Sequence, residues 1–198
     1  LAANVVKGDF GKPPERLFLD WSDMPVAAAS IGQVHRAITH DGRDVAVKVQ
    51  YPGVHEAIES DLDAAEVMYA MFSSMMLKGL DAKGLVDELR DRMREELDYS
   101  IEAGNVAEFE ARFQGHPWVR IPKLVPELCS ARVLTTEWID GMTFDQFRKT
   151  ASSATKQRAA EVIWRFAQGA IMRHGIFNGD PHPGNYKFHH DGSVSFLD

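Results

Sequence analysis

Cysteine is scarce in this sequence, since Cys129 is the only one among 198 residues. A single thiol excludes an intrachain disulfide and fits a reducing compartment. Paired cysteines are therefore absent, and none of the eight histidines has the helical spacing of a zinc protease. We expect no zinc site.

Long hydrophobic runs and an excess of positive charge are also missing. The longest apolar stretch, Val67 to Leu77, is too short to span a bilayer and follows several acidic residues. We expect no secretory signal ahead of the domain. The formal net charge of -7 excludes the broad basic surface that binds nucleic acid. With 44% hydrophobic and 26% charged residues, the composition is that of an ordinary globular protein.

The patterns that are present predict an α+β fold. Residues 1–24 are of mixed polarity and predict a lead-in segment. Residues 25–140 predict a strand-rich lobe with inserted helices, and residues 141–198 predict the first part of a helical lobe. The expected elements are strands within 26–49 joined by a turn at Asp41-Gly42, helices over 58–80, 85–113 and 155–174, a strand over 132–136, and a hairpin over 185–197.

Lys48 is an unexpected residue in its surroundings, because the run Val45-Ala46-Val47-Lys48-Val49 is otherwise an apolar strand. Alternation along a strand places the three valines on one face and Ala46 with Lys48 on the other. The small Ala46 leaves room for a flat ring, and the ammonium two residues on can meet phosphate. The alternative is an edge strand whose lysine points to solvent.

A carboxylate partner for Lys48 is expected in the second long helix. Glu96 follows Leu89 by seven residues and Met93 by three, which places it on the face that packs inward. An unpaired buried charge costs several kcal/mol, so we expect Glu96 to pair with Lys48. The alternative leaves Glu96 as a solvated acid among its acidic neighbours.

The strongest local pattern is Asn178-Gly179-Asp180-Pro181-His182-Pro183-Gly184-Asn185. Two prolines restrict the backbone and two glycines permit tight torsions, which suits a rigid turn that holds a polar side chain. Asp180 and Asn185 are five residues apart, as are the aspartate and asparagine of the kinase catalytic loop. Asp198 ends the following hairpin, where a kinase places a magnesium-binding aspartate. A plain Gly/Pro turn is the alternative.

One segment departs from ordinary kinases. Where a glycine-rich loop would cover the phosphates, this chain has an alanine-rich loop around Ala27-Ala28-Ala29-Ser30. Alanine resists positive φ, so this loop cannot fold over phosphates as closely as glycine would. A whole extra helix also separates Lys48 from Glu96.

Together with the motifs, these departures resemble the UbiB-type (AarF-domain) atypical kinases, over roughly Pro25 to Asp198. The segments that carry the resemblance are Ala27–Ala37, Val45–Gly53, Glu96–Tyr99, Glu102–Asn105, Thr136–Gly141 and Asn178–Asn185. The family's K-x-G-Q signature has no counterpart before Pro25, and the chain stops before an activation segment.

The resemblance implies a protein-kinase-like fold of two lobes, the helical one truncated, that binds ATP or ADP with Mg²⁺. It implies that Lys48 contacts phosphate and pairs with Glu96, and that Asp180 is the catalytic-loop acid. Asn185 and Asp198 would be magnesium ligands. The implied nucleotide contacts are Ala27, Ala28, Ala29, Ser30, Val34, Ala46 and the hinge residues Glu137, Trp138 and Ile139.

Two hypotheses follow. The first is an atypical kinase or ATPase linked to ubiquinone or other prenyl-lipid metabolism, either cytoplasmic and peripheral to a membrane or organellar. The second is a pseudokinase that uses nucleotide as a switch and acts as an adaptor or lipid-handling protein. The alanine-rich loop and the sequence Asn178-Gly179-Asp180, in place of His-Arg-Asp, favour the second. The order of Lys48, Glu96, Asp180, Asn185 and Asp198 favours the first.

Overall fold

The computed structural model describes residues 1–76 and 82–197, which form two compact units. The first unit contains residues 1–102 and 126–135, and the second contains residues 103–125 and the chain from residue 136 onward. The boundary between residues 102 and 103 falls inside helix α5 (Tyr99–Phe113), and the boundary between residues 135 and 136 falls inside strand β6 (Val133–Glu137). An α+β architecture was expected and is confirmed, whereas the predicted lobe limits near residue 140 stay predictions.

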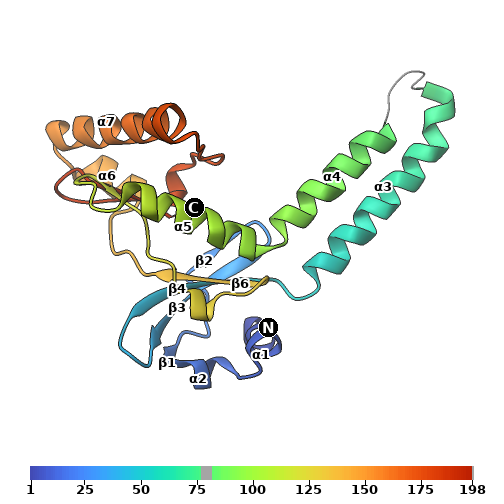
Figure 1. Cartoon of the computed structure of the whole chain (residues 1–198), viewed down its shortest axis with the longest axis horizontal. Coiled ribbons are helices and arrows are strands. Elements are labelled where there is room, and N and C mark those ends of the chain that lie inside the picture. The colour runs from blue at the N-terminus through green and yellow to red at the C-terminus, as the bar shows by residue number, and fades with distance from the viewer. Residues whose placement is uncertain (77–81, 198) are drawn as a thin grey trace. The chain divides into compact units, whose positions relative to one another are not determined.

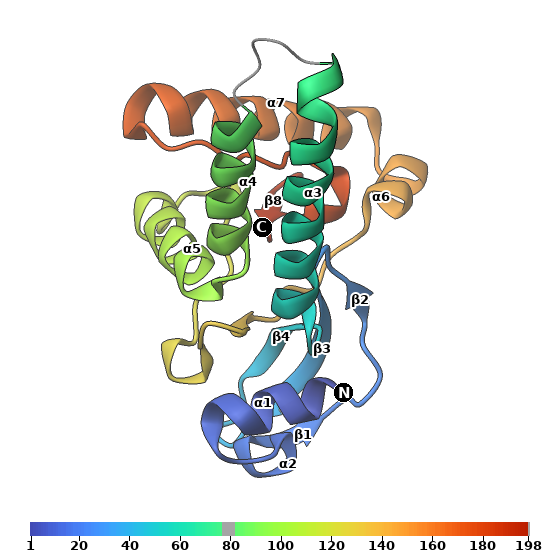
Figure 2. The same ribbon diagram turned by 90° about the vertical axis from the view of Figure 1, so that its right-hand side faces the viewer.

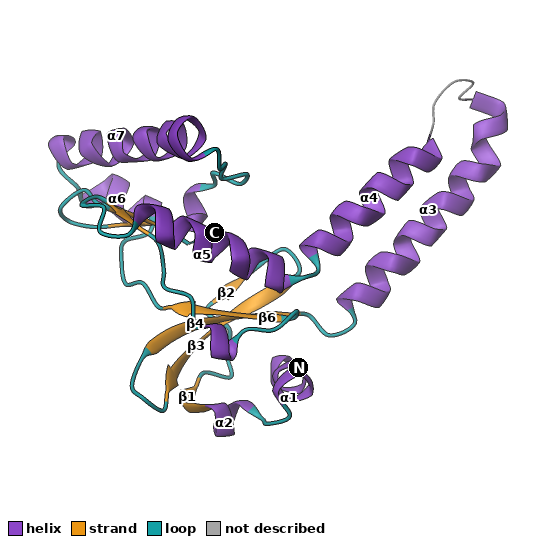
Figure 3. Ribbon diagram, viewed as in Figure 1, coloured by secondary structure: helices purple, strands orange, loops and turns teal. Residues whose placement is uncertain are grey.

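The first unit is built on an antiparallel sheet, whose strands are orange in Figure 3. Its strands are β1 (Phe18–Trp21), β2 (Ala27–Ala28), β3 (Gly32–Thr39), β4 (Asp44–Gln50) and β6 (Val133–Glu137). They lie in the order β1-β3-β4-β6, with β2 paired to β3. The hairpin turn between β3 and β4 was correctly predicted, and Gly42 takes there a φ of 85° that favours glycine.

Residues near the N-terminus belong to the first unit's core rather than to a bare lead-in. Helices α1 (Ala2–Phe10) and α2 (Pro14–Leu17) precede β1, which pairs with β3. The side chain of Val6 is fully buried and that of Phe18 is 2% exposed. Asp9 also accepts hydrogen bonds from Ser130 and Arg132 near β6. Mixed polarity hid this role, because short amphipathic elements carry little periodic signal.

Three helices follow β4: α3 (Val54–Met76), α4 (Ala82–Glu96) and α5 (Tyr99–Phe113). Helices α3 and α4 lie side by side in Figures 1 and 2. A helix was expected over 58–80, and its residues 77–80 lie outside the described part. The broad apolar face expected for it is only partly buried, since Leu62 is 6% exposed but Met68 is 60% exposed.

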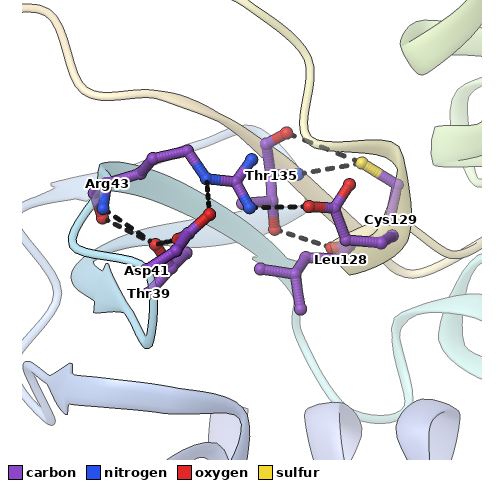
Figure 4. Close-up of polar contacts among 7 residues, drawn as sticks. Thr39, Asp41, Arg43, Leu128, Cys129 and Thr135 are labelled. Atoms are coloured by element: carbon purple, nitrogen blue, oxygen red, sulfur yellow. Dashed lines mark hydrogen bonds and ion pairs between the residues drawn. The ribbon is translucent and has the colours of Figure 1, made fainter.

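The segment from residue 126 to 135 is fastened to the first unit by polar contacts. It begins with the short 3-10 helix η1 (Pro126–Leu128). Arg43 of the hairpin donates hydrogen bonds to Asp41 and to Glu127, and Thr135 Oγ1 donates to the Leu128 carbonyl at 2.7 Å (Figure 4). Burial raises the pKa of the Cys129 thiol, whose sulfur accepts a hydrogen bond from the Thr135 amide.

The second unit packs helices against a small sheet. Its further elements are β5 (Val119–Arg120), α6 (Phe144–Thr150), α7 (Ser153–Gly169), the π-helical turn η2 (Ala170–His174), the 3-10 turn η3 (Pro183–Asn185), β7 (Tyr186–Phe188) and β8 (Val194–Phe196). The core is aromatic, with Phe166 stacked on Phe196 and Phe147 stacked on Phe188. The expected helix over 155–174 and the final hairpin are both present, and Gly175 ends the helix with a φ of 67°.

Candidate functional site

Lys48 lies on the face of β4 that alternation predicts. Val45, Val47 and Val49 on the opposite face are at most 1% exposed, and the Lys48 side chain is 18% exposed. The paired strand β3 places Val34 directly opposite Lys48 and Arg36 opposite Ala46. The register therefore brings the predicted residues Val34, Ala46 and Lys48 onto one face of the sheet.

The carboxylate that the structure describes beside Lys48 is that of Glu102, not that of Glu96. The Lys48 ammonium lies 2.8 Å from Glu102 Oε1 and 3.0 Å from Oε2. The ring of Tyr99 lies under the same ammonium, with 5.1 Å between Nζ and the ring centroid. Because the two charged side chains are only 18% and 25% exposed, their attraction is screened less than that of a surface pair.

The predicted pairing with Glu96 is wrong because the expected helix over 85–113 is broken. Helix α4 ends at Glu96, which is exposed, and α5 begins at Tyr99. Asp98 lies between them and accepts a hydrogen bond from the Ser100 amide at 2.9 Å, as an N-terminal cap does. A break shifts the phase of the helical repeat, so the inward acid comes one turn into the new helix.

A sequence signal for this break was present. Asp98 followed by Tyr99 and Ser100 is the type of sequence that starts a helix. Glu102 lies in a segment that carries the family resemblance, but the helical periodicity assigns it no role. With the cap recognised, Glu102 would have fallen in the first turn of the second helix, where a negative charge is favoured by the helix dipole.

The alanine-rich loop is a short extended arm. Ala27 pairs with Val34 and Ala28 with Gln33, and the turn closes with a hydrogen bond from the Ala29 amide to the Gly32 carbonyl at 2.8 Å. Among the described residues, none other than glycine has positive φ. The loop thus avoids the tight conformations that alanine resists, in line with the expectation from its sequence.

In the second unit, the structure brings Asp180 and Asn185 together. Asn185 Nδ2 donates to Asp180 Oδ2 at 3.0 Å, and the Asn178 side chain accepts a hydrogen bond from the Asp180 amide. Tyr186 follows directly, and burial together with the nearby Asp180 carboxylate raises the pKa of its phenol. The turn therefore holds a carboxylate and an amide side by side, as its sequence predicts.

The other predicted site residues are those of the hinge and Asp198. Glu137 is exposed and its amide donates to the Lys123 carbonyl, while Trp138 Nε1 donates to Asp140. Asp198 lies outside the described residues. The structure describes Lys48 and Glu102 in the first unit and Asp180 and Asn185 in the second, each within its own unit.

An oxygen-rich pair of an amide and a carboxylate has the donor chemistry that Mg²⁺ prefers. The side-chain oxygen of Asn185 is a donor of this kind, and the Asn185 amide nitrogen is held by the Asp180 carboxylate. The described residues contain no group of three histidine, cysteine or acidic side chains able to hold a metal. Within residues 1–76 and 82–197, no helix has both the length and the apolar character to cross a bilayer.

Comparison with known proteins gives a consistent result. The family model of the ABC1 atypical kinase-like domain matches residues 1–198. The chain is 36% identical to the Arabidopsis thaliana protein ACTIVITY OF BC1 COMPLEX KINASE 1, chloroplastic, over all of this chain and 30% of that protein. It is 41% identical to the atypical kinase coq-8, mitochondrial, of Caenorhabditis elegans, over 71% of this chain and 18% of that protein.

A solved structure is also similar to this chain over its full length. The Mycobacterium tuberculosis protein Rv3197, solved as a complex with erythromycin, is 38% identical and superposes with a TM-score of 0.84. The match covers 100% of this chain and 50% of Rv3197. The chain thus spans half or less of each of these three proteins.

Proposed function

We propose that this chain, which belongs to the ABC1 (UbiB-type) atypical kinase-like family, binds ATP or ADP with Mg²⁺. We further propose that it hydrolyses ATP or transfers the γ-phosphoryl group of ATP. Membership was expected from the motifs and is confirmed, as is the kinase-like fold. Nucleotide binding and catalysis are our proposal, and so is the activity of the whole protein, of which this chain covers a part.

The observation that carries the proposal is the contact between Lys48 and Glu102. A lysine on a half-buried strand face, held by a helical glutamate at 2.8 Å, has the arrangement that orients an ammonium toward nucleotide phosphates in kinases. Val34 and Ala46 flank Lys48 with small apolar side chains suited to a flat base. A lysine placed only for solubility would not need a partner carboxylate that is itself half-buried.

The Asp180 turn supports the catalytic half of the proposal. We assign Asp180 the role of catalytic-loop acid, and Asn185 with Asp198 the role of magnesium ligands. Magnesium would neutralise charge on the phosphates as it develops. The hydrogen bond between Asn185 and Asp180 holds both side chains in fixed orientations, which is what positioning a metal and a nucleophile requires.

A second candidate is a pseudokinase that binds nucleotide as a switch. It is favoured by the alanine-rich arm, which pairs with β3 and leaves Ala27 and Ala28 exposed. An arm of this kind differs from a glycine-rich loop that folds over the phosphates. Asp180→Asn separates the two candidates, measured as biological function of the full-length protein. Loss of function by both Lys48→Ala and Asp180→Asn supports catalysis, whereas loss by Lys48→Ala alone supports the switch.

The link to ubiquinone or other prenyl lipids remains part of the proposal, as does a membrane or prenyl-lipid partner. It draws on the family resemblance and on the relative named coq-8, mitochondrial. The compartment is likewise proposed. Two relatives are named chloroplastic and mitochondrial, which favours an organelle if the protein is eukaryotic. In a bacterium we propose the cytoplasm, at the membrane surface. Turnover that depends on a prenyl-quinone headgroup analogue would support the link.

The test of the proposed function is thermal stabilisation of the full-length protein by ATP or ADP, with and without Mg²⁺. A ligand at about 100 times its Kd stabilises the folded state by about 2.7 kcal/mol, which raises the Tm by several degrees. We expect this rise to need Mg²⁺ and to be lost in Lys48→Ala. An equal Tm with and without nucleotide in wild-type protein contradicts the proposal, and full turnover by Asp198→Asn contradicts its catalytic part.

A further inference from the structure

Gln50 is a buried polar residue two positions after Lys48, at the end of β4. Its side chain lies on the same face of the strand as Lys48, yet the residue is only 2% exposed. A primary amide removed from water needs partners for its donors, because an unpaired one is costly. The hydrogen bonds of the Gln50 amide therefore indicate which segments it holds together.

Both contacts run to main-chain carbonyls of other segments. Gln50 Nε2 donates to the Leu97 carbonyl at 2.7 Å and, more weakly, to the Ala131 carbonyl at 3.4 Å. The Gln50 main-chain amide also donates to the Arg132 carbonyl at 3.1 Å. Gln50 thus joins β4 to the junction that precedes α5 and to the segment that precedes β6.

These contacts fix the beginning of α5. The Tyr99 amide donates to the Ala131 carbonyl at 2.9 Å, so Gln50 and the first residue of α5 share one acceptor. Leu97 is 6% exposed, so the junction before the helix is itself buried. Glu102 follows Tyr99 by three residues, less than one helical turn, and its direction depends on how this turn is anchored.

Tyr99 completes the anchor beneath the lysine. Its residue is 2% exposed, and its ring lies under the Lys48 ammonium. Gly32 lies opposite Gln50 in the sheet, and a Cβ added there would come within 2.9 Å of the Tyr99 hydroxyl. The missing side chain at Gly32 therefore provides the room into which Tyr99 packs.

We propose that Gln50 is a positioning residue for the nucleotide site: its buried amide fixes the first turn of α5, and through it Glu102, opposite Lys48. The Lys48–Glu102 pair is then already formed in the folded first unit, and α5 does not need to move when nucleotide binds. This inference rests on the proposed function for its effect on nucleotide binding, but its structural part can be tested separately.

The test uses Gln50→Met in the full-length protein, because methionine keeps the length and removes the donor. Amide hydrogen exchange of peptides covering residues 98–105 should become faster, since the anchor of α5 is lost. The Kd for ATP with Mg²⁺ should rise about tenfold, a change of about 1.4 kcal/mol. Gln50→Asn, which keeps an amide but shortens the side chain, should shift both measurements in the same direction by less.

The matched control is Thr39→Val. Thr39 is also buried, at 3% exposed, in the same unit, and its hydroxyl accepts from the Arg43 amide at the hairpin end of the sheet (Figure 4). The substitution removes the hydrogen bonds of this hydroxyl at the end of β3 opposite to Gly32, the residue that pairs with Gln50. It should lower the Tm while leaving exchange over 98–105 and the Kd for nucleotide unchanged.

The outcomes separate the inference from the proposed function. If Gln50→Met only lowers the Tm, as Thr39→Val does, with exchange over 98–105 and the Kd unchanged, Gln50 is merely structural and the inference is overturned. If wild-type protein binds no nucleotide, the proposed function fails. In that case faster exchange over 98–105 in Gln50→Met still supports the positioning of Glu102, and unchanged exchange overturns it.

Discussion

Lys48 on β4 and Glu102 on α5 form a half-buried ion pair. The alternation of the valine strand correctly predicts the face of Lys48, because the side-chain repeat of a strand is fixed at two residues. The partner could not be found by the same reasoning. It depends on a helix break at Leu97 and Asp98, and one break changes which acid faces inward.

Gly32 gives a prediction at the same scale. A Cβ at this position would lie 2.4 Å from the Val49 carbonyl oxygen, so Gly32→Ala must displace Val49, Tyr99 or both. We expect a loss of about 1–3 kcal/mol in the free energy of unfolding, the usual cost of overpacking. The measurement is denaturant unfolding of the purified protein.

Gly104→Ala is the control for that experiment. Gly104 is exposed inside α5, and a Cβ added there would have no described neighbour within 4 Å outside the helix's own backbone. Alanine is favoured over glycine in a helix by up to about 1 kcal/mol, so this variant should be slightly more stable than wild type. Equal effects of the two substitutions would contradict the close packing at Gly32.

His189 gives a prediction for pH. Burial, and then the charge of Arg120, lower the pKa of His189 below its usual 6.5. Below pH 6.5 the unfolded chain binds the proton more readily than the folded one, so stability present above that pH is lost as the pH falls through the folded-state pKa. His189→Gln should therefore flatten the decline in Tm below pH 6.5.

Part of that decline should remain in the variant, because burial also lowers the pKa of His116. His190→Gln is the matched control, since the neighbouring His190 is exposed. A pH dependence of the Tm that is identical in wild type and His189→Gln would show that His189 does not contribute.

At the scale of elements, periodicity located the helices but not their ends. The stripe of apolar residues predicts α7, and Gly175 marks the end of the π-helical turn η2 that continues it. The hairpin of β7 and β8 follows from its turn residues in the same way. The break between α4 and α5 escaped, because the apolar repeat runs across it and only Asp98 marks it.

Helix α6 gives a prediction about an element's end. Thr143 accepts a hydrogen bond from the Gln146 amide, and the Gln146 side chain accepts one from the Thr143 amide, which together form a capping box. Thr143→Ala should lower the free energy of unfolding by about 1 kcal/mol. Thr143→Ser keeps the capping oxygen and should cost much less in the same denaturant titration. Equal losses would show that the cap is not what stabilises α6.

The contact between helices α3 and α4 gives a further prediction, which concerns Arg90. Arg90 of α4 lies 2.5 Å from Glu59 and 3.0 Å from Asp63 of α3, and its side chain is 16% exposed. Arg90→Leu leaves the acids of α3 without this cation, so amide exchange in residues 54–69 should become faster.

Arg92 is the control for Arg90. It is exposed and pairs only within α4, with Glu88 and Glu95, among the contacts the structure describes. Arg92→Leu should leave exchange over residues 54–69 unchanged. Faster exchange in both variants, or in neither, would contradict a specific role of Arg90 in joining the two helices.

At the scale of the whole molecule, the sequence predicted the class of fold and the order of its motifs. The sequence did not show which distant segments of the chain pack into the same unit. The first residues join the sheet of the first unit, and residues 126–135 return to it after a helix that continues into the second unit. Such returns depend on packing between segments far apart in the chain, which local patterns do not encode.

The proposed nucleotide site depends most on Glu102, the residue that holds Lys48 in place. The direct measurement is the Kd of the full-length protein for ATP with Mg²⁺, in wild type, Glu102→Gln and Glu108→Gln. Glu108 lies on the same helix but is exposed and paired with Arg112, so its substitution serves as the control. We expect Glu102→Gln to weaken binding at least about tenfold, or about 1.4 kcal/mol, and Glu108→Gln to bind as wild type does. Equal affinity in all three proteins would contradict the account.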